Sequence, residues 1–324
     1  MQIVQYKSAV ICAPAWRAPL IVGVLGLAWY FWLPDQLGLL TKLAFISLLV
    51  LSLDLIVGYA GLATLGHAAI FGVGAYAAGI FALRIHTDPI LGLIVGMFAG
   101  GGVAFLTGLF LLRYQGFTFL MLTVAVAQII QNLANKFRNW TGGDDGLSGF
   151  TMAPLLGQYS FDLEGKTAAL YALITLVVFY YLARRLVDSP FGLSVRGIHE
   201  NRDRMTALGT PVYRRLVLIY IFSGVLAGAA GALSAQTNAI VGLDSLNFSL
   251  SAEILVMLIL GGAGRLHGAL IGSIIFALLH HTAASINPYH WLFVIGLALM
   301  TVVLLPPEKM IQRIKTSLHG WSHQ

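Results

Sequence analysis

Charged residues are scarce in this sequence. Asp, Glu, Lys and Arg together make up 10% of its 324 residues, whereas a soluble domain carries about 25%. Hydrophobic residues make up 58%, and the mean hydropathy is +0.84. Both departures point to lipid as the solvent of most of the chain, so an ordinary soluble globular domain is excluded.

Several kinds of functional motif are also missing. Cys12 is the only cysteine, so no intramolecular disulfide can form. The sequence has no CxxC or HExxH metal spacing, no GxxxxGK[ST] phosphate loop and no GxSxG nucleophile elbow. His280 and His281 are adjacent, so they would lie on different sides of a helix and chelate a metal poorly. We therefore expect no metal, cofactor or ATP site here, and no enzyme active site.

Long apolar runs are what the sequence has instead. The runs are bounded by charges or by glycine and proline breaks, and they lie at 18–33, 43–59, 61–83, 90–112, 116–134, 168–187, 216–236, 251–261, 268–281 and 289–305. A membrane-spanning helix needs about 20 apolar residues, so 251–261 is too short to span alone. With 268–281 it predicts a broken or re-entrant element, or one long kinked helix.

The expected fold is an all-α polytopic membrane protein, a bundle of about 8–10 transmembrane helices with broken or re-entrant segments. We expect one transmembrane domain over residues 1–324. Pro34, Asp35 and Gln36 follow the first apolar run, where a signal peptide would have small residues at a cleavage site. The first run is therefore predicted to stay as an uncleaved span.

Basic residues predict the orientation. With the N-terminus inside and ten alternating segments, fourteen of the 19 Lys and Arg residues lie on the cytoplasmic side, as the positive-inside rule requires. This predicts a multi-pass protein of the bacterial inner membrane with both termini cytoplasmic. Residues 135–167 then form a periplasmic loop and residues 184–215 a cytoplasmic loop. The same rule explains the net charge of +6 without a nucleic-acid partner.

Glycine is abundant, with 36 residues. Four pairs have a spacing of four residues: Gly96–Gly100, Gly224–Gly228, Gly264–Gly268 and Gly268–Gly272. Small residues at this spacing let membrane helices approach closely. The pattern therefore predicts close helix packing, without indicating a function.

The segment from Asp54 to His67 is the first candidate for a translocation path. Asp54 lies inside an apolar run, Gly58 and Gly61 lie in a glycine-rich interruption, and His67 follows them. A carboxylate at bilayer depth is costly and faces the bundle interior or a cavity. A broken helix with its backbone along the path would explain the pattern. A tight turn with a snorkelling His67, and an Asp54 at the membrane edge, would explain it as well.

Two further polar positions lie within apolar runs. Gln128 shares one helix face with Gln131 and Asn132, because residues three and four apart are neighbours on a helix. This face would line a pore or form hydrogen bonds to neighbouring helices. Glu253 stands near the outer start of its run, where an interfacial position or a helix N-terminus accommodates a carboxylate.

The arginine-rich loop at 184–215 predicts a partner-binding element. Ser189-Pro190 is a turn signal, and the residues from 198 to Gly209 suit a short helix that ends at a glycine. Such a helix would lie on anionic lipid or dock a cytoplasmic partner. Its acidic residues favour the partner.

Four motifs together resemble a known family. They are Gly58-Tyr59-Ala60-Gly61 with Leu65-Gly66-His67, Thr141-Gly142-Gly143 with Asp145-Gly146-Leu147, Ser189-Pro190-Phe191-Gly192 through Glu200-Asn201 to Ala207-Leu208-Gly209, and Leu260-Gly261-Gly262 with Gly264 and Gly268. In this order they resemble the permeases of branched-chain amino-acid ABC importers, specifically the LivM-like subunit. The resemblance runs from about residue 43 to 305, most of the chain.

The resemblance implies a heteromeric importer. A LivH-like second permease would pair with this chain, two cytoplasmic ATPase subunits would power it, and a periplasmic binding protein would deliver the substrate. The inner loop would touch the ATPase through Glu200, Asn201, Ala207 and Gly209. ATP hydrolysis would take place on the partner subunits, in agreement with the missing phosphate loop.

Two departures from the family pattern concern the substrate. Asp54 stands where the family pattern has Asn, and Gln128 stands where amino-acid permeases often have Glu. Gln128 also fits relatives that carry urea or short amides, so an ABC permease for those solutes is an alternative. A stand-alone secondary transporter is another, although it usually carries more intramembrane charge along its path.

Overall fold

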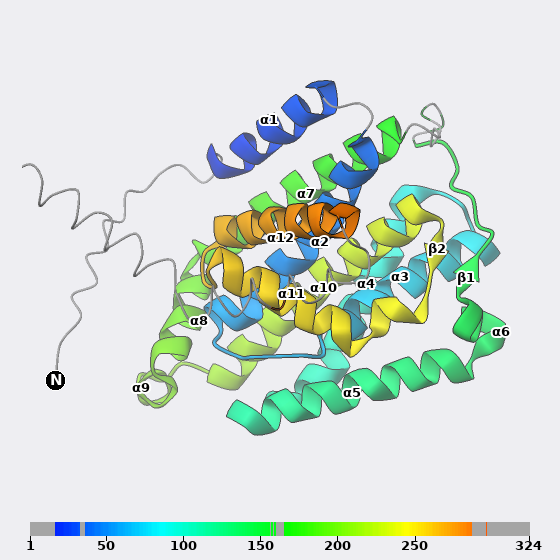
Figure 1. Ribbon diagram of the computed structural model, residues 1–324. Helices are drawn as coiled ribbons and strands as arrows, with labels where there is room; N and C mark the ends of the chain where they lie inside the picture. The colour runs from blue at the N-terminus through cyan, green and yellow to red at the C-terminus, as the bar shows by residue number, and fades with distance from the viewer. Residues whose placement is uncertain are drawn as a thin grey trace, which may run out of the picture.

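The computed structural model describes residues 17–32, 36–155, 157, 159, 165–286 and 296, and it is almost entirely helical there (Figure 1). This confirms the all-α polytopic prediction. Among the described residues, six helical segments are long and apolar enough to cross a membrane. They are α2 (Leu37–Asp54) continued by the π-helical turn η2 (Leu55–Tyr59), α3 (His67–Arg84), α4 (Pro89–Leu111), α5 (Gly116–Lys136), α7 (Lys166–Val187) and α10 (Val212–Asn238). The predicted last span at 289–305 and both termini lie outside the described residues.

The glycines four residues apart bring α4 and α10 into close contact. A Cβ atom at Gly100 would overlap the backbone of Gly224 and Gly228, and one at Gly96 would overlap Ala232. At the same contact, Gly74 of α3 lies directly on Gly228 and close to Gly96. The glycine pattern therefore packs three helices backbone to backbone, as predicted.

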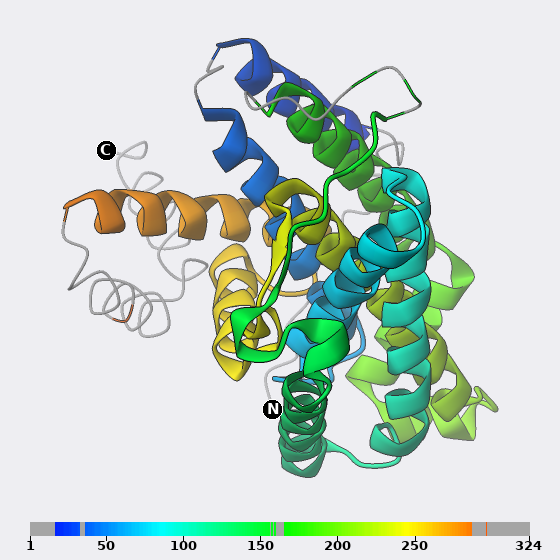
Figure 2. The same ribbon diagram turned by 90° about the vertical axis from the view of Figure 1, so that its right-hand side faces the viewer.

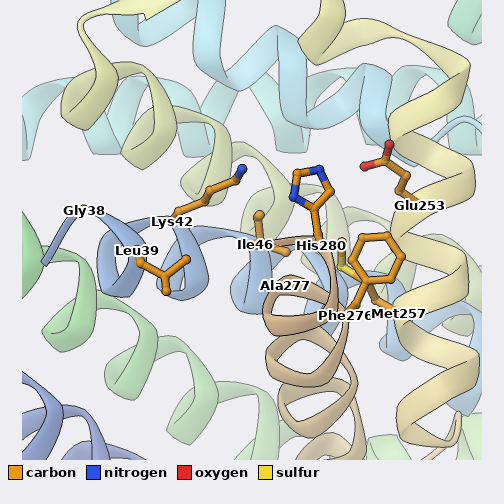
Figure 3. Close-up of a pocket in the computed structure, with 9 residues that line it drawn as sticks. All are labelled: Gly38, Leu39, Lys42, Ile46, Glu253, Met257, Phe276, Ala277 and His280. Atoms are coloured by element: carbon orange, nitrogen blue, oxygen red, sulfur yellow. The ribbon is translucent and has the colours of Figure 1, made fainter. Parts of the chain in front are cut away.

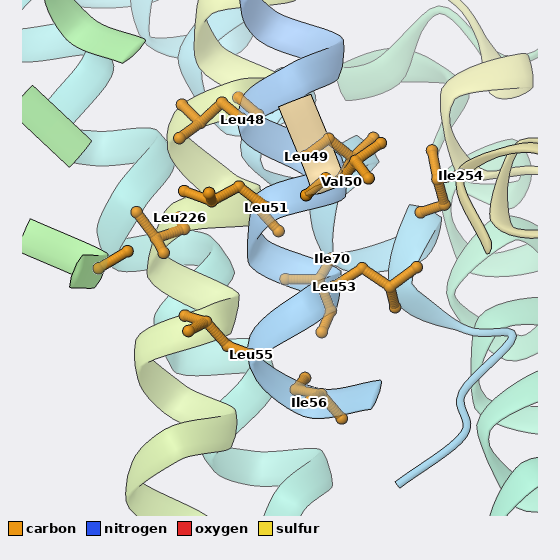
Figure 4. Close-up of a cluster of buried hydrophobic side chains, with 14 of the residues drawn as sticks. Leu48, Leu49, Val50, Leu51, Leu53, Leu55, Ile56, Ile70, Leu226 and Ile254 are labelled. Carbon is orange, nitrogen blue, oxygen red and sulfur yellow. The ribbon is translucent and has the colours of Figure 1, made fainter. Parts of the chain in front are cut away.

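α2 runs through the middle of the bundle. Its large side chains are buried on every side, including Leu48, Leu51 and Leu53 (Figure 4). A helix that is apolar all round is buried all round. By contrast, α1 (Arg17–Trp32) leaves Leu25 and Phe31 mostly exposed, which suits a helix at the lipid boundary.

The last described helices form a hairpin. The chain turns through 115° between α11 (Phe248–Gly261) and α12 (Leu266–Ile286), so the two predicted runs are a bent pair, not one long kinked helix. Gly268 and Gly272 pack against the backbone of α11 around Gly261. Gly264 lies in the turn itself with φ +82°, so the predicted pair Gly264–Gly268 is not a helix-packing pair.

The two predicted loops lie at opposite ends of the bundle (Figure 1). One end carries α6 (Arg138–Thr141), the 3₁₀ turns η3 (Gly143–Asp145) and η4 (Leu243–Leu246), and the two short antiparallel strands β1 (Leu147–Ser148) and β2 (Ile240–Val241). This end, which we call the strand end, faces the viewer in Figure 2. The other carries α8 (Pro190–Glu200) and α9 (Arg202–Ala207) and is called the α8–α9 end.

Candidate functional site

The helix that begins at Leu37 breaks where the glycine-rich segment begins. After Asp54 it widens into the π-helical turn η2, and residues 60–66 then run without regular structure until α3 starts at His67. We call residues 55–66 the break. The side chains along this stretch alternate, with Leu62 and Thr64 buried and Gly61 and Ala63 exposed. The structure therefore has the predicted broken helix, with part of its backbone at the molecular surface. His67 is 1% exposed, so it does not snorkel.

Asp54 is fully buried at the end of α2. Its Oδ1 accepts a hydrogen bond of 2.7 Å from the backbone N–H of Gly264, in the turn between α11 and α12. A Cβ at Gly58 would overlap both this carboxylate and Gly264, so only glycine allows this approach. Asp54 thus ties the broken helix to the tip of the α11–α12 hairpin.

Helix α8 lies directly against the break. The guanidinium carbon of Arg196 lies 4.8 Å from the ring centre of Tyr59, within cation–π range. The imidazole of His199 lies over Gly61, where a Cβ would overlap it. Beside these contacts is a cavity of about 260 Å³, lined by Tyr59, Tyr180, Arg184, Val187, Asp188, Arg196, Gly264, Arg265, Leu266 and His267. Movement of α8 would therefore act on residues 59–61 directly.

His67 lies in a separate, interior polar cluster. Its Nε2 is 2.8 Å from the hydroxyl of Ser52 and 3.5 Å from that of Ser223. Ser223 in turn donates a hydrogen bond to the backbone carbonyl of Ser52. These contacts join α2, α3 and α10 at the core, so His67 connects the start of α3 to the helices that surround it.

Gln128 is far less enclosed than Asp54 and His67. It is exposed on α5, and so is Asn132, while Gln131 is partly buried. The buried face of α5 is formed by Phe119, Thr123 and Ala127. The predicted path residues are therefore distributed over three places: the break, the interior histidine cluster and the outer face of α5.

The arginine-rich loop forms two helices, so the prediction of one continuous helix from 198 to 209 is wrong. α8 starts at Pro190, with Ser189 accepting a capping hydrogen bond from Gly192. It ends at Glu200 because Asn201 is extended and its Oδ1 caps α9 through the N–H of Arg204, at 2.9 Å. Gly209 follows α9 with φ +78°, as the predicted glycine stop requires.

The outer face of these two helices is exposed. α8 buries Gly192, Val195 and Ile198 against the bundle. Leu193 and Leu208 remain 60% and 71% exposed, and the predicted coupling residues Glu200, Asn201, Ala207 and Gly209 are exposed as well. The three-residue spacing of Gly192, Val195 and Ile198 can be seen in the sequence and is typical of one helix face. The contacts of Arg196 and His199 with the break cannot be seen there.

Acidic and metal-binding side chains do not cluster at this site. Within the described part of the chain, no group of three or more His, Cys, Asp or Glu side chains is placed to hold a metal ion. What the site offers is a buried carboxylate anchored to a turn, an irregular backbone segment and an exposed pair of helices resting on that segment.

The chain has relatives of known type. The family model described as "Branched-chain amino acid transport system / permease component" matches residues 36–304. The chain is 27% identical over 313 residues to the high-affinity branched-chain amino acid transport system permease protein LivM of Escherichia coli, a match that covers 87% of this chain and 72% of the relative. LivM of Salmonella typhimurium is 25% identical with the same coverage.

A sugar permease is also similar. The L-arabinose ABC transporter permease protein AraH of Azospirillum brasilense is 25% identical over 224 residues, covering 66% of this chain and 63% of the relative. No solved structure matches the chain.

Proposed function

This chain belongs to the family of branched-chain amino acid transport permease components, and we propose that it carries leucine, isoleucine and valine across the inner membrane as the LivM-like subunit of an ABC importer. One observation carries this proposal beyond the family. The exposed helices α8 and α9 rest on the broken helix through Arg196 and His199. A stand-alone transporter has no need of such a docking element.

Four kinds of partner complete the proposal. A LivH-like permease would cover part of α5, of which only a small share is buried in the chain itself, and membrane lipid would cover α1. Two ATPase subunits would bind at α8 and α9. A periplasmic binding protein would deliver the substrate at the strand end.

The proposed orientation places α8 and α9 in the cytoplasm. The arginines of 184–215 lie at that end, and the positive-inside rule favours basic residues there. Cysteines introduced as Ser148→Cys and Thr206→Cys, at two exposed positions, should then react with an impermeant reagent from opposite sides of the membrane. Labelling of both from one side would contradict this orientation.

The proposed mechanism couples the ATPase to the break. Closure of the ATPase dimer would move α8 and α9 as a unit, because Met205 of α9 packs on Gly197 of α8. His199 and Arg196 would pass this movement to Gly61 and Tyr59. Asp54 and His67 then shape the passage, while selectivity lies mainly with the binding protein.

The docking role predicts a defect in coupling. Leu208→Glu places a charge where an exposed apolar side chain would contact the ATPase, and burial of a leucine side chain contributes about 1.5–3 kcal/mol. We expect ATP hydrolysis stimulated by the loaded binding protein to fall at least about tenfold. Tyr114→Glu is the matched control, because Tyr114 is also exposed but lies in the α4–α5 connection. Parental stimulation in the Leu208 variant would reject the docking role.

The substrate is tested by uptake. Vesicles containing the complete importer are expected to accumulate leucine, isoleucine and valine in an ATP-dependent manner. Urea, arabinose and ribose serve as competitors that represent the amide and sugar alternatives. Uptake of urea or a sugar in place of the three amino acids would replace the proposed substrate.

A further inference from the structure

A second cavity lies near the start of α2, where that helix meets the α11–α12 hairpin (Figure 3). It measures about 310 Å³ and is lined by Gly38, Leu39, Lys42, Ile46, Glu253, Met257, Phe276, Ala277 and His280. Pockets for small molecules range upward from about 300 Å³, so this one suits a small solute. Lys42 precedes Asp54 by twelve residues of α2, or about 18 Å of helix, so the cavity lies toward the strand end.

The lining has an apolar and a polar side. Ile46, Met257 and Phe276 contribute apolar surface. Lys42 and Glu253 contribute opposite charges and act on each other electrostatically, although within the described residues no ion pair joins them directly. Figure 3 shows the imidazole of His280 between the Lys42 ammonium and the Glu253 carboxylate.

A solute that fits this lining has three parts. A carboxylate would be held by the Lys42 ammonium, and an ammonium group by the Glu253 carboxylate. Both contacts are charge-assisted hydrogen bonds, which are stronger than neutral ones. A short branched hydrocarbon would cover Ile46 and Phe276. Urea and sugars carry neither charge, and they would form neither of these charge-assisted hydrogen bonds.

We propose that this cavity is a substrate-binding site on the permease itself, specific for zwitterionic amino acids with an apolar side chain. The inference rests on the proposed function and deepens it. The binding protein would release its substrate at the strand end, and the cavity would hold the zwitterion before it moves toward the break at Asp54. This site would then add to the selectivity that lies mainly with the binding protein.

Direct binding tests the site apart from transport. The permease–ATPase complex, without the binding protein, is placed in lipid discs of phosphatidylglycerol, which has no ammonium group to compete for the cavity. Titration calorimetry with L-leucine should show saturable binding. Lys42→Met and Glu253→Gln should each weaken it at least tenfold. Lys136→Met is the matched control, since Lys136 is exposed at the end of α5, and it should bind like the parent.

Substrate analogues identify which charge each residue recognises. Leucinamide lacks the carboxylate and 4-methylpentanoate lacks the ammonium group, so each should bind the parent at least tenfold more weakly than leucine. Lys42→Met should no longer distinguish leucine from leucinamide, and Glu253→Gln should no longer distinguish leucine from 4-methylpentanoate. Lys42→Arg and Glu253→Asp keep the charges and should retain binding, which shows that loss in the other variants is not misfolding.

Two results would overturn the inference. One is parental leucine affinity in both Lys42→Met and Glu253→Gln, and the other is no saturable leucine binding to the parent complex. Leucine uptake by the parent importer is measured separately with the binding protein present. If that uptake occurs while either result holds, the proposed function stands and only the cavity assignment falls. If the parent does not transport leucine, the proposed function itself fails.

Discussion

Replacing Gly61 with leucine is expected to reduce leucine uptake about 100-fold. Gly61 has φ +72°, a conformation that costs a residue with a side chain about 1–2 kcal/mol. A Cβ there would also overlap the imidazole of His199, and forcing extra atoms into a packed contact costs about 1–3 kcal/mol. Together these terms disfavour the docked position of α8 by about 3 kcal/mol, or about 100-fold.

Gly116→Leu is the matched control for this variant. Gly116 also has a left-handed backbone, with φ +60°, but a Cβ there meets nothing within 4 Å. The control therefore carries the backbone strain without the collision with α8. Uptake into vesicles is measured after co-purification has shown that the partner subunits are bound. Equal uptake by the two variants would mean that the contact with His199 plays no part in transport.

Asp54→Leu is expected to reduce uptake about 30-fold, and Asp54→Asn no more than about twofold. Leucine leaves the N–H of Gly264 without the acceptor that Asp54 Oδ1 provides at 2.7 Å, and a buried donor without a partner costs about 1–3 kcal/mol. Asparagine keeps an oxygen at the same place. The tip of the α11–α12 hairpin should therefore lose its attachment to α2 in Asp54→Leu and keep it in Asp54→Asn.

Thr41→Val serves as the control on the same helix. Thr41 is buried like Asp54, but its hydroxyl bonds only to the carbonyl of Leu37 one turn earlier in α2. Its loss should leave uptake near the parental rate. If Asp54→Leu assembles with its partners and transports like the parent, then the contact with Gly264 is not needed for transport, and Asp54 does not shape the passage.

Patterns among residues close together in the chain account for the features of the fold that could be predicted from the sequence. The length and hydropathy of a run decide whether a helix can span a membrane, so the spans from α2 to α10 were predictable. The spacing of Gly96 with Gly100, and of Gly224 with Gly228, predicted close packing because it places small residues on one helix face. The split at Asn201 was missed, because Asn is tolerated in helices and only its capping contact with Arg204 shows where α8 ends.

The sequence by itself determined the class of protein, the glycine-rich interruption after Asp54 and the glycine stop at Gly209, since each depends on residues close together in the chain. Only the tertiary structure decided which of these elements meet. Asp54 and Gly264 are 210 positions apart, and Lys42 and Glu253 line one cavity only because the hairpin packs on α2. Such pairings depend on packing between distant helices, and no local pattern in the sequence encodes them.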